Sequence, residues 1–308
     1  MREPSSRLPT GLHFLQRGWL SSNSVLLRDE AHSVLIDTGY WTHASQTLSL
    51  VNEALQGQPL TRILNTHLHS DHCGGNATLQ AAFSDVETLI PPGHASHVFD
   101  WDPAALSYTP TGQHCPVFKA DGLIQPGDEF SVAGMLWRAY AAPGHDPDSL
   151  FYFSPSHKVL VSADALWENG FGVVFPEIEG IDAFAVVGQT LDLIEHLEPE
   201  IVLPGHGDVF DDIPTALKRA RSRLKMFEDD PNKHAIYAAK VLVKFKLLEL
   251  QRVEVETFFN WAQSCSLLGI LHQRFAASAS LREWLQNLLS ELVSANAASV
   301  DGTSICNA

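Results

Sequence analysis

The chain has 308 residues, of which 45% are hydrophobic and 18% are charged, so it can form a packed core and disorder is not expected. This length fits one large domain, or a large domain with a smaller one. The formal net charge of −16 disfavours nucleic acid as a partner, because an acidic surface repels phosphate backbones. The four cysteines show neither CxxC spacing nor the density of a disulfide framework, which indicates free thiols in a reducing compartment.

The N-terminal segment has no apolar stretch of signal-peptide length. No run of about 18 apolar residues, the length that a membrane-spanning helix needs, occurs anywhere in the sequence. We therefore expect a cytoplasmic protein with no membrane partner. The sequence does not indicate an oligomeric state.

The first 210 residues interleave short β-prone runs with segments of helical periodicity. The expected strands are 24–28, 33–36, 62–65, 86–90, 135–141, 150–154, 158–163 and 200–203. The expected helices of this part are 42–56, 74–83 and 182–197, and Asp182 is the expected N-cap of the last one. This order predicts a mixed α/β fold without the regular βαβ alternation of a doubly wound sheet.

The pattern changes after about residue 210, where helical periodicity predominates. The expected helices are 213–228, 233–250, 253–271 and 281–293, and Ser280 with Glu283 forms a capping box before the last. We therefore expect a strand-rich domain over 1–210 and a helical domain over 211–294. The small and polar residues of 295–308 predict a flexible tail.

Four potential metal ligands lie within six residues, directly after the strand expected at 62–65. They are His67, His69, Asp71 and His72. Residues two apart in an extended chain point to the same side, so His67 and His69 can bind one ion together. Asp71 and His72 require a turn, which the glycine pair at 74–75 supports. A second ion nearby is the natural interpretation, and a solvated, histidine-rich loop is the alternative.

Three further residues of ligand type each follow an expected strand. They are His145, Asp164 and His206. Binding sites are commonly built on loops that a rigid sheet holds in place. Any one of these residues taken alone is more often structural, but their combination with the first cluster favours a metal site.

These seven residues, in this order and context, resemble the metallo-β-lactamase superfamily and most closely its glyoxalase II-like hydrolase branch. The resemblance covers about residues 12–210 and implies a four-layer αββα sandwich with metals at one edge, followed by a C-terminal helical appendage. It implies that His67, His69 and His145 bind one ion, that Asp71, His72 and His206 bind the other, and that Asp164 bridges them. Asp37 matches a motif position of this family whose residue usually supports the metal ligands. The string Asp-Pro-Asp-Ser after His145 departs from the usual pattern of the family.

The resemblance implies hydrolysis of a small-molecule thioester or other activated ester by a hydroxide shared between two divalent ions. Metal binding lowers the pKa of water to about 7, so no serine or cysteine nucleophile is required. Asp71 is the candidate for orienting the water and passing a proton to the leaving group. Zinc is the first choice of metal for a redox-neutral hydrolysis, and iron and manganese remain open.

Other functions remain open at this stage. They are a lactonase, a mononuclear iron oxygenase of the persulfide-dioxygenase type, a phosphodiesterase and a non-catalytic binding scaffold. We expect Cys73 to be a packed side chain rather than a nucleophile. Residues 166–178 are either core or an apolar wall that holds an acyl or thioester chain. The basic run over 218–225 is either a solvated helix face or a site for an anionic carrier such as glutathione or coenzyme A.

Overall fold

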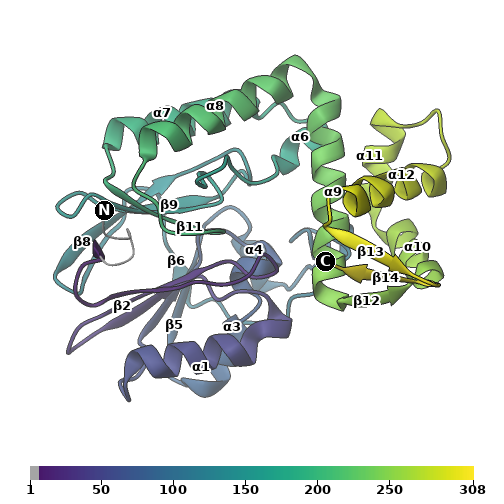
Figure 1. The fold of residues 1–308 in the computed structure, drawn as a ribbon. Coiled ribbons are helices and arrows are strands. Elements are labelled where there is room, and N and C mark those ends of the chain that lie inside the picture. Colours follow the sequence, from purple (N-terminus) through teal and green to yellow (C-terminus); the bar gives the residue numbers. More distant parts are fainter. Residues whose placement is uncertain (1–6) are drawn as a thin grey trace.

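The computed structural model describes residues 7–308 and contains two β-sheets stacked face to face, with helices on both outer sides (Figure 1). The first sheet has the strand order β1-β2-β3-β4-β5-β6. Its strands are β1 (Leu12–Leu15), β2 (Ser24–Arg28), β3 (Ser33–Ile36), β4 (Arg62–Leu64), β5 (Glu87–Ile90) and β6 (Gly122–Leu123). The antiparallel pairs β1–β2 and β2–β3 are followed by parallel pairs from β3 to β6. Residues 1–6, the start of the segment in which we expected no signal peptide, lie outside the described residues.

The second sheet has the order β11-β10-β9-β8-β7. Its strands are β7 (Glu129–Val132), β8 (Met135–Ala141), β9 (Leu150–Ser154), β10 (Val159–Ala163) and β11 (Ile201–Pro204). Only β10 and β11 run parallel, with helix α7 (Phe184–Leu197) in the connection between them. Short helices lie in the loops: η2 (Trp41–His43), α2 (Ser70–Cys73), α4 (Ala95–Phe99), α5 (Tyr108–Thr111) and α6 (Phe175–Glu179).

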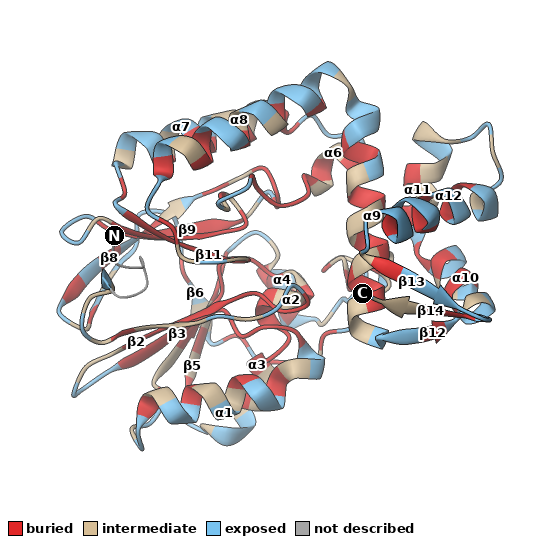
Figure 2. Cartoon of the chain, viewed as in Figure 1, coloured by how far each residue is buried: buried red, intermediate tan, exposed pale blue. Residues whose placement is uncertain are grey.

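Apolar side chains join the four layers. Leu27 and Ile36 of the first sheet pack with Trp137 and Tyr152 of the second, and this contact forms the central core. Helices α1 (Ala44–Leu55) and α3 (Asn76–Ala82) cover the outer face of the first sheet. Helices α7 and α8 (Ile213–Asp229) cover the second. Buried residues therefore run along the strands of both sheets (Figure 2), and the expected αββα sandwich is confirmed.

The C-terminal part stands beside the sandwich and has its own hydrophobic core (Figure 1). Its elements are α9 (Pro231–Leu250), β12 (Arg252–Glu254), α10 (Val255–Ser264), α11 (Ser266–Phe275), α12 (Leu281–Ser294), β13 (Ala298–Asp301) and β14 (Ser304–Asn307). Helix α8 belongs to the sandwich, because its Leu217 and Leu224 pack in the same core as α7. We therefore propose a domain boundary near residue 230 in place of 210. No helix of the described chain is long and apolar enough to cross a membrane.

Three expectations about local structure were wrong. The tail does not fray, because β13 and β14 form a hairpin whose second strand pairs with β12. The single helix expected over 253–271 is divided into β12, α10 and α11, and the extended backbone of Cys265 separates the two helices. Asp182 does not cap α7; the Glu177 carboxylate instead accepts the backbone N–H groups of residues 183 and 184.

The C-terminal hairpin is expected to contribute to stability through Ile305, which is only 1% exposed and packs in the C-terminal core. The substitution Ile305→Ala should reduce the free energy of unfolding by about 2–4 kcal/mol, because it removes buried methyl groups and leaves a cavity. Chemical denaturation followed by circular dichroism measures this loss. Val300→Ala on the neighbouring strand is the matched control, because Val300 is 58% exposed; an equal loss in both variants would contradict the packing role of Ile305.

Candidate metal centre

All seven predicted ligand residues lie at the carboxyl ends of strands, on one edge of the sandwich. The segment after β4 carries His67 and His69 in extended chain, and the short helix α2 carries Asp71 and His72. The turn that we expected at this point is therefore a helical turn. The remaining three residues follow strands of the second sheet: His145 after β8, Asp164 after β10 and His206 after β11.

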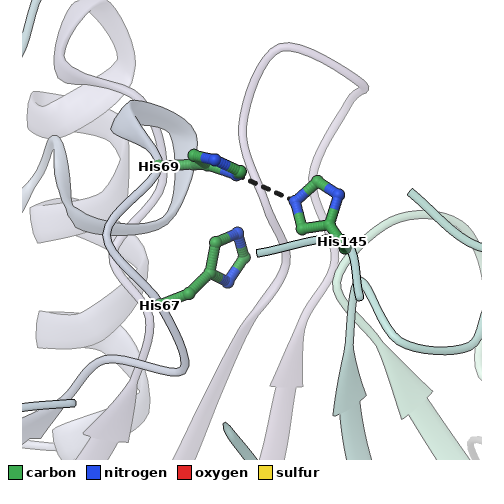
Figure 3. Close-up of side chains that lie close together, drawn as sticks. All are labelled: His67, His69 and His145. Atoms are coloured by element: carbon green, nitrogen blue, oxygen red, sulfur yellow. Dashed lines mark hydrogen bonds between the residues drawn. The ribbon is translucent and has the colours of Figure 1, made fainter. Parts of the chain in front are cut away.

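Three histidines converge in the first part of the cluster. His67, His69 and His145 each offer one nitrogen, and these atoms lie within 4.8 Å of one another (Figure 3). His69 Nδ1 and His145 Nε2 are 2.8 Å apart. His67 Nε2 is buried and has no hydrogen-bond partner among the described residues. Buried polar atoms are rarely left without a partner, so this nitrogen indicates a missing cation.

A second group lies next to the first. Asp71, His72 and His206 also place their ligand atoms within 4.8 Å of one another, and His206 Nε2 is 3.2 Å from Asp71 Oδ2. His72 Nε2 is a second buried nitrogen without a hydrogen-bond partner within the described chain. The donor set of imidazoles and carboxylates, with two such nitrogens, fits divalent metal ions.

The carboxylate of Asp164 lies between the two groups. Its oxygens are 3.4 Å from His72 Nε2, 3.5 Å from His145 Nε2 and 3.8 Å from His206 Nε2. Glycine is required beside it, because a Cβ atom on Gly205 would lie 2.3 Å from Asp164 Oδ1. The structure therefore brings all seven predicted residues together.

The electrostatics of the cluster differ between its two parts. Burial lowers the pKa of His67, and it lowers the pKa of His69 and of His145 to about 4. These three imidazoles are therefore neutral near pH 7, which leaves a nitrogen lone pair free for a metal.

The second part of the cluster carries the carboxylates. Burial opposes protonation of His72, but Asp37, Asp164 and Asp71 together outweigh it and hold the His72 pKa well above its usual value. Burial also opposes ionisation of Asp164, yet His206 and His72 keep the pKa of Asp164 well below its usual value. The imidazoles and carboxylates of this part thus offset part of each other's cost of burial.

Two supporting contacts orient the imidazoles. Asp37, which is 2% exposed, accepts a hydrogen bond from His72 Nδ1 at 2.8 Å and two more from the backbone and hydroxyl of Thr66. His145 Nδ1 donates to the carbonyl oxygen of Val173 at 2.5 Å. Each contact directs the other ring nitrogen, Nε2, into the cluster, as is usual for metal-binding histidines.

A pocket of about 700 Å³, which includes open solvent at its mouth, adjoins the cluster. Trp167 and Phe175 line it, whereas Phe171 is 1% exposed and belongs to the core, so the segment 166–178 contributes both to the core and to the wall of the pocket. Two other walls of the pocket were not expected from the sequence, namely Trp19 and one face of α9. No sequence pattern around Trp19 or α9 predicts that they line the pocket, because both reach it only through tertiary packing.

Two other expectations concern residues near the site. Cys73 is fully buried and packs beside Cys115 and Tyr108, which agrees with a packed side chain.

The basic run on α8 is largely paired: Arg219 contacts Glu168, Lys225 contacts Asp229, and Arg221 contacts Asp192 and Glu195. Most of its charge is thus compensated within the protein.

Comparisons with known proteins agree with this geometry. Among curated proteins, the chain is similar to an atrochrysone carboxyl ACP thioesterase from Aspergillus fumigatus, 26% identical over 215 residues that cover 69% of this chain and 43% of that protein. A hydroxyacylglutathione hydrolase from Rhodopseudomonas palustris is 32% identical over 120 residues, which are 39% of each chain. The chain spans about half the length of the curated relatives that it matches.

Among solved structures, a metallo-beta-lactamase family protein from Thermus thermophilus has the same fold. It aligns with a TM-score of 0.57 and 21% identity over 97% of this chain and 99% of that one. The family model described as the metallo-beta-lactamase superfamily matches residues 17–206, which include all seven clustered residues. The chain therefore belongs to the metallo-beta-lactamase superfamily.

Proposed function

We propose that this protein is a dinuclear metal-dependent hydrolase that acts on a thioester or another activated ester. The position of the Asp164 carboxylate carries the proposal, because it lies within 3.8 Å of imidazoles from both groups of ligands. His67, His69 and His145 would hold one ion, and Asp71, His72 and His206 the other. The curated relatives add support, since an ACP thioesterase and a hydroxyacylglutathione hydrolase act on thioesters, as their names state.

Divalent ions in these positions would supply a nucleophile from water near neutral pH and would stabilise negative charge on the substrate carbonyl oxygen. Zinc is our first choice, since the reaction is redox-neutral and the ligands are imidazoles and carboxylates. The pocket beside the cluster would hold the acyl group and exclude bulk water.

Asp71 is the residue that we propose for proton transfer. It lines the pocket, and its Oδ2 lies 3.2 Å from His206 Nε2. In this role its carboxylate would orient the attacking water and pass a proton to the leaving group.

Metal analysis and a substrate panel test the function. We expect protein purified without added metal to contain two divalent ions per chain and to hydrolyse thioesters faster than matched oxygen esters and lactones. Chelation should abolish this activity, and added zinc should restore it. One iron per chain with oxygen uptake, or metal-replete protein inert toward all three bond types, would overturn the proposal.

The substitution Asp71→Asn tests the proton transfer. The amide cannot accept a proton, so turnover should fall about 100-fold or more when it is measured at full metal occupancy. Asp29→Asn is the control and should keep wild-type turnover, because Asp29 lies in the turn between β2 and β3 and outside the seven residues. Unchanged turnover of Asp71→Asn at full metal occupancy would limit Asp71 to metal binding.

The substitution Asp37→Asn tests the support of His72. One oxygen of Asp37 accepts from both His72 and Thr66 and the other accepts from the Thr66 backbone, so an amide NH₂ at either position would face a donor. We expect metal affinity to fall about 10- to 100-fold, measured by competition with a chromophoric chelator.

Asp29→Asn is the matched control for this variant. Asp29 accepts backbone N–H groups in the turn between β2 and β3 and has no contact with the cluster. If Asp37→Asn bound metal with wild-type affinity, the hydrogen bond from His72 to Asp37 would not contribute to metal binding.

A further inference from the structure

The pocket beside the metal centre has an apolar wall built from three separate parts of the chain. Trp19 comes from the loop between β1 and β2, and Trp167 and Phe175 come from the segment after β10. Helix α9 adds Tyr237, Val241 and Phe245, which are spaced four residues apart and so share one helix face. The C-terminal part of the chain therefore shapes the pocket directly.

The two tryptophans form an aromatic corner at the cluster. The Trp19 ring stacks on the His206 ring with centroids 5.5 Å apart and an interplanar angle of 2°. Trp167 lies edge-on to both rings, at 5.5 Å from Trp19 and 5.4 Å from His206. Trp19 is nevertheless 57% exposed, although it is large and apolar. Such a ring at the edge of a pocket offers an aromatic ligand a stacking or edge-on contact.

No lysine or arginine within residues 7–308 lines this pocket. Arg223, which contacts the α9 wall, is already engaged: its guanidinium lies over the Tyr237 ring at 5.4 Å and donates to the carbonyl oxygen of Phe171. Lys246 on α9 pairs with Glu249. The protein as a whole carries a formal charge of −16. Apart from the proposed metal ions, an anionic carrier would thus find neither a lysine or arginine in the pocket nor a favourable net charge on the protein.

From these observations we infer that the pocket binds an uncharged aromatic acyl group, and that its thioester or ester is recognised through this group rather than through an anionic carrier. The inference rests on the proposed hydrolase function and specifies its substrate class. The Trp19 and Trp167 corner contacts the aromatic rings, and the α9 face limits their size. Val241 is the central residue of that face, with Tyr237 and Phe245 one turn away on either side.

The acyl preference is tested with thioesters of one neutral thiol, N-acetylcysteamine. We expect kcat/KM for the 2-naphthoyl thioester to exceed that for the acetyl thioester at least tenfold. The 2-naphthoyl thioester of glutathione should be no better a substrate than that of N-acetylcysteamine. A clear preference for the glutathione thioester would overturn the inference.

The substitution Val241→Phe should fill the pocket and reduce the naphthoyl-to-acetyl ratio of kcat/KM at least tenfold. Ile236→Phe is the matched control: Ile236 is on the same helix but is 39% exposed and does not line the pocket, so the ratio should stay unchanged. An equal naphthoyl-to-acetyl ratio of kcat/KM in the wild type and both variants would contradict the proposal that the α9 face limits the size of the acyl group.

Binding of 2-naphthamide, a neutral analogue without a thioester, separates this inference from the proposed function. Isothermal titration calorimetry should show binding with a negative heat-capacity change, and Val241→Phe should weaken it at least tenfold. Such binding by a protein that hydrolyses no thioester would overturn the hydrolase function and uphold the pocket assignment. Absent binding, together with equal rates for naphthoyl and acetyl thioesters, would overturn the inference and leave the hydrolase function standing.

Discussion

The buried carboxylate of Asp164 joins the two sheets at the edge where the site is built. It lies 3.4 Å from His72, which follows the first sheet, and 3.5 Å and 3.8 Å from His145 and His206, which follow the second. A buried carboxylate is costly unless it is paired, and so is a buried imidazole nitrogen without a partner. Cations shared by these groups would remove both costs. The cluster is therefore best understood as a site that metal ions complete.

The sequence predicted the site more completely than its surroundings. Each ligand residue lies within a few residues of a strand whose apolar pattern is local, so His67, His145 and His206 could be placed at strand ends from the sequence alone. The register of the strands and the stacking of the two sheets then bring these strand ends together. The face of α9 could not be found in this way, because a helix that is apolar on several sides does not reveal which residues will line a pocket.

The errors in the C-terminal part have a related cause. The strands β13 and β14 contain small and polar residues; β14 pairs with β12, about fifty residues earlier in the chain, and β13 pairs with β14. The apolar spacing of 253–271 continues through Cys265, so periodicity alone could not show the break between α10 and α11. The cap of α7 comes from Glu177, which belongs to a different helix, α6. In each case tertiary contacts override local preference.

The segment after Asp164 connects the metal centre to the C-terminal part. Val173 accepts the His145 ring N–H through its carbonyl oxygen while its side chain packs in the C-terminal core. A Cβ atom on Gly172 would lie 2.4 Å from His145 Nδ1, so the close approach requires glycine. The next residue, Val174, donates its backbone N–H to His234 of α9 at 3.1 Å.

This hydrogen bond requires a neutral His234 imidazole, and burial lowers the His234 pKa to about 4, so it is neutral across the physiological range. Three consecutive residues thus contact both His145, a candidate metal ligand, and helix α9. A shift of α9 relative to the sandwich would move both the apolar wall and His145. For this reason the C-terminal part is better regarded as a component of the candidate site and its pocket than as a separate appendage.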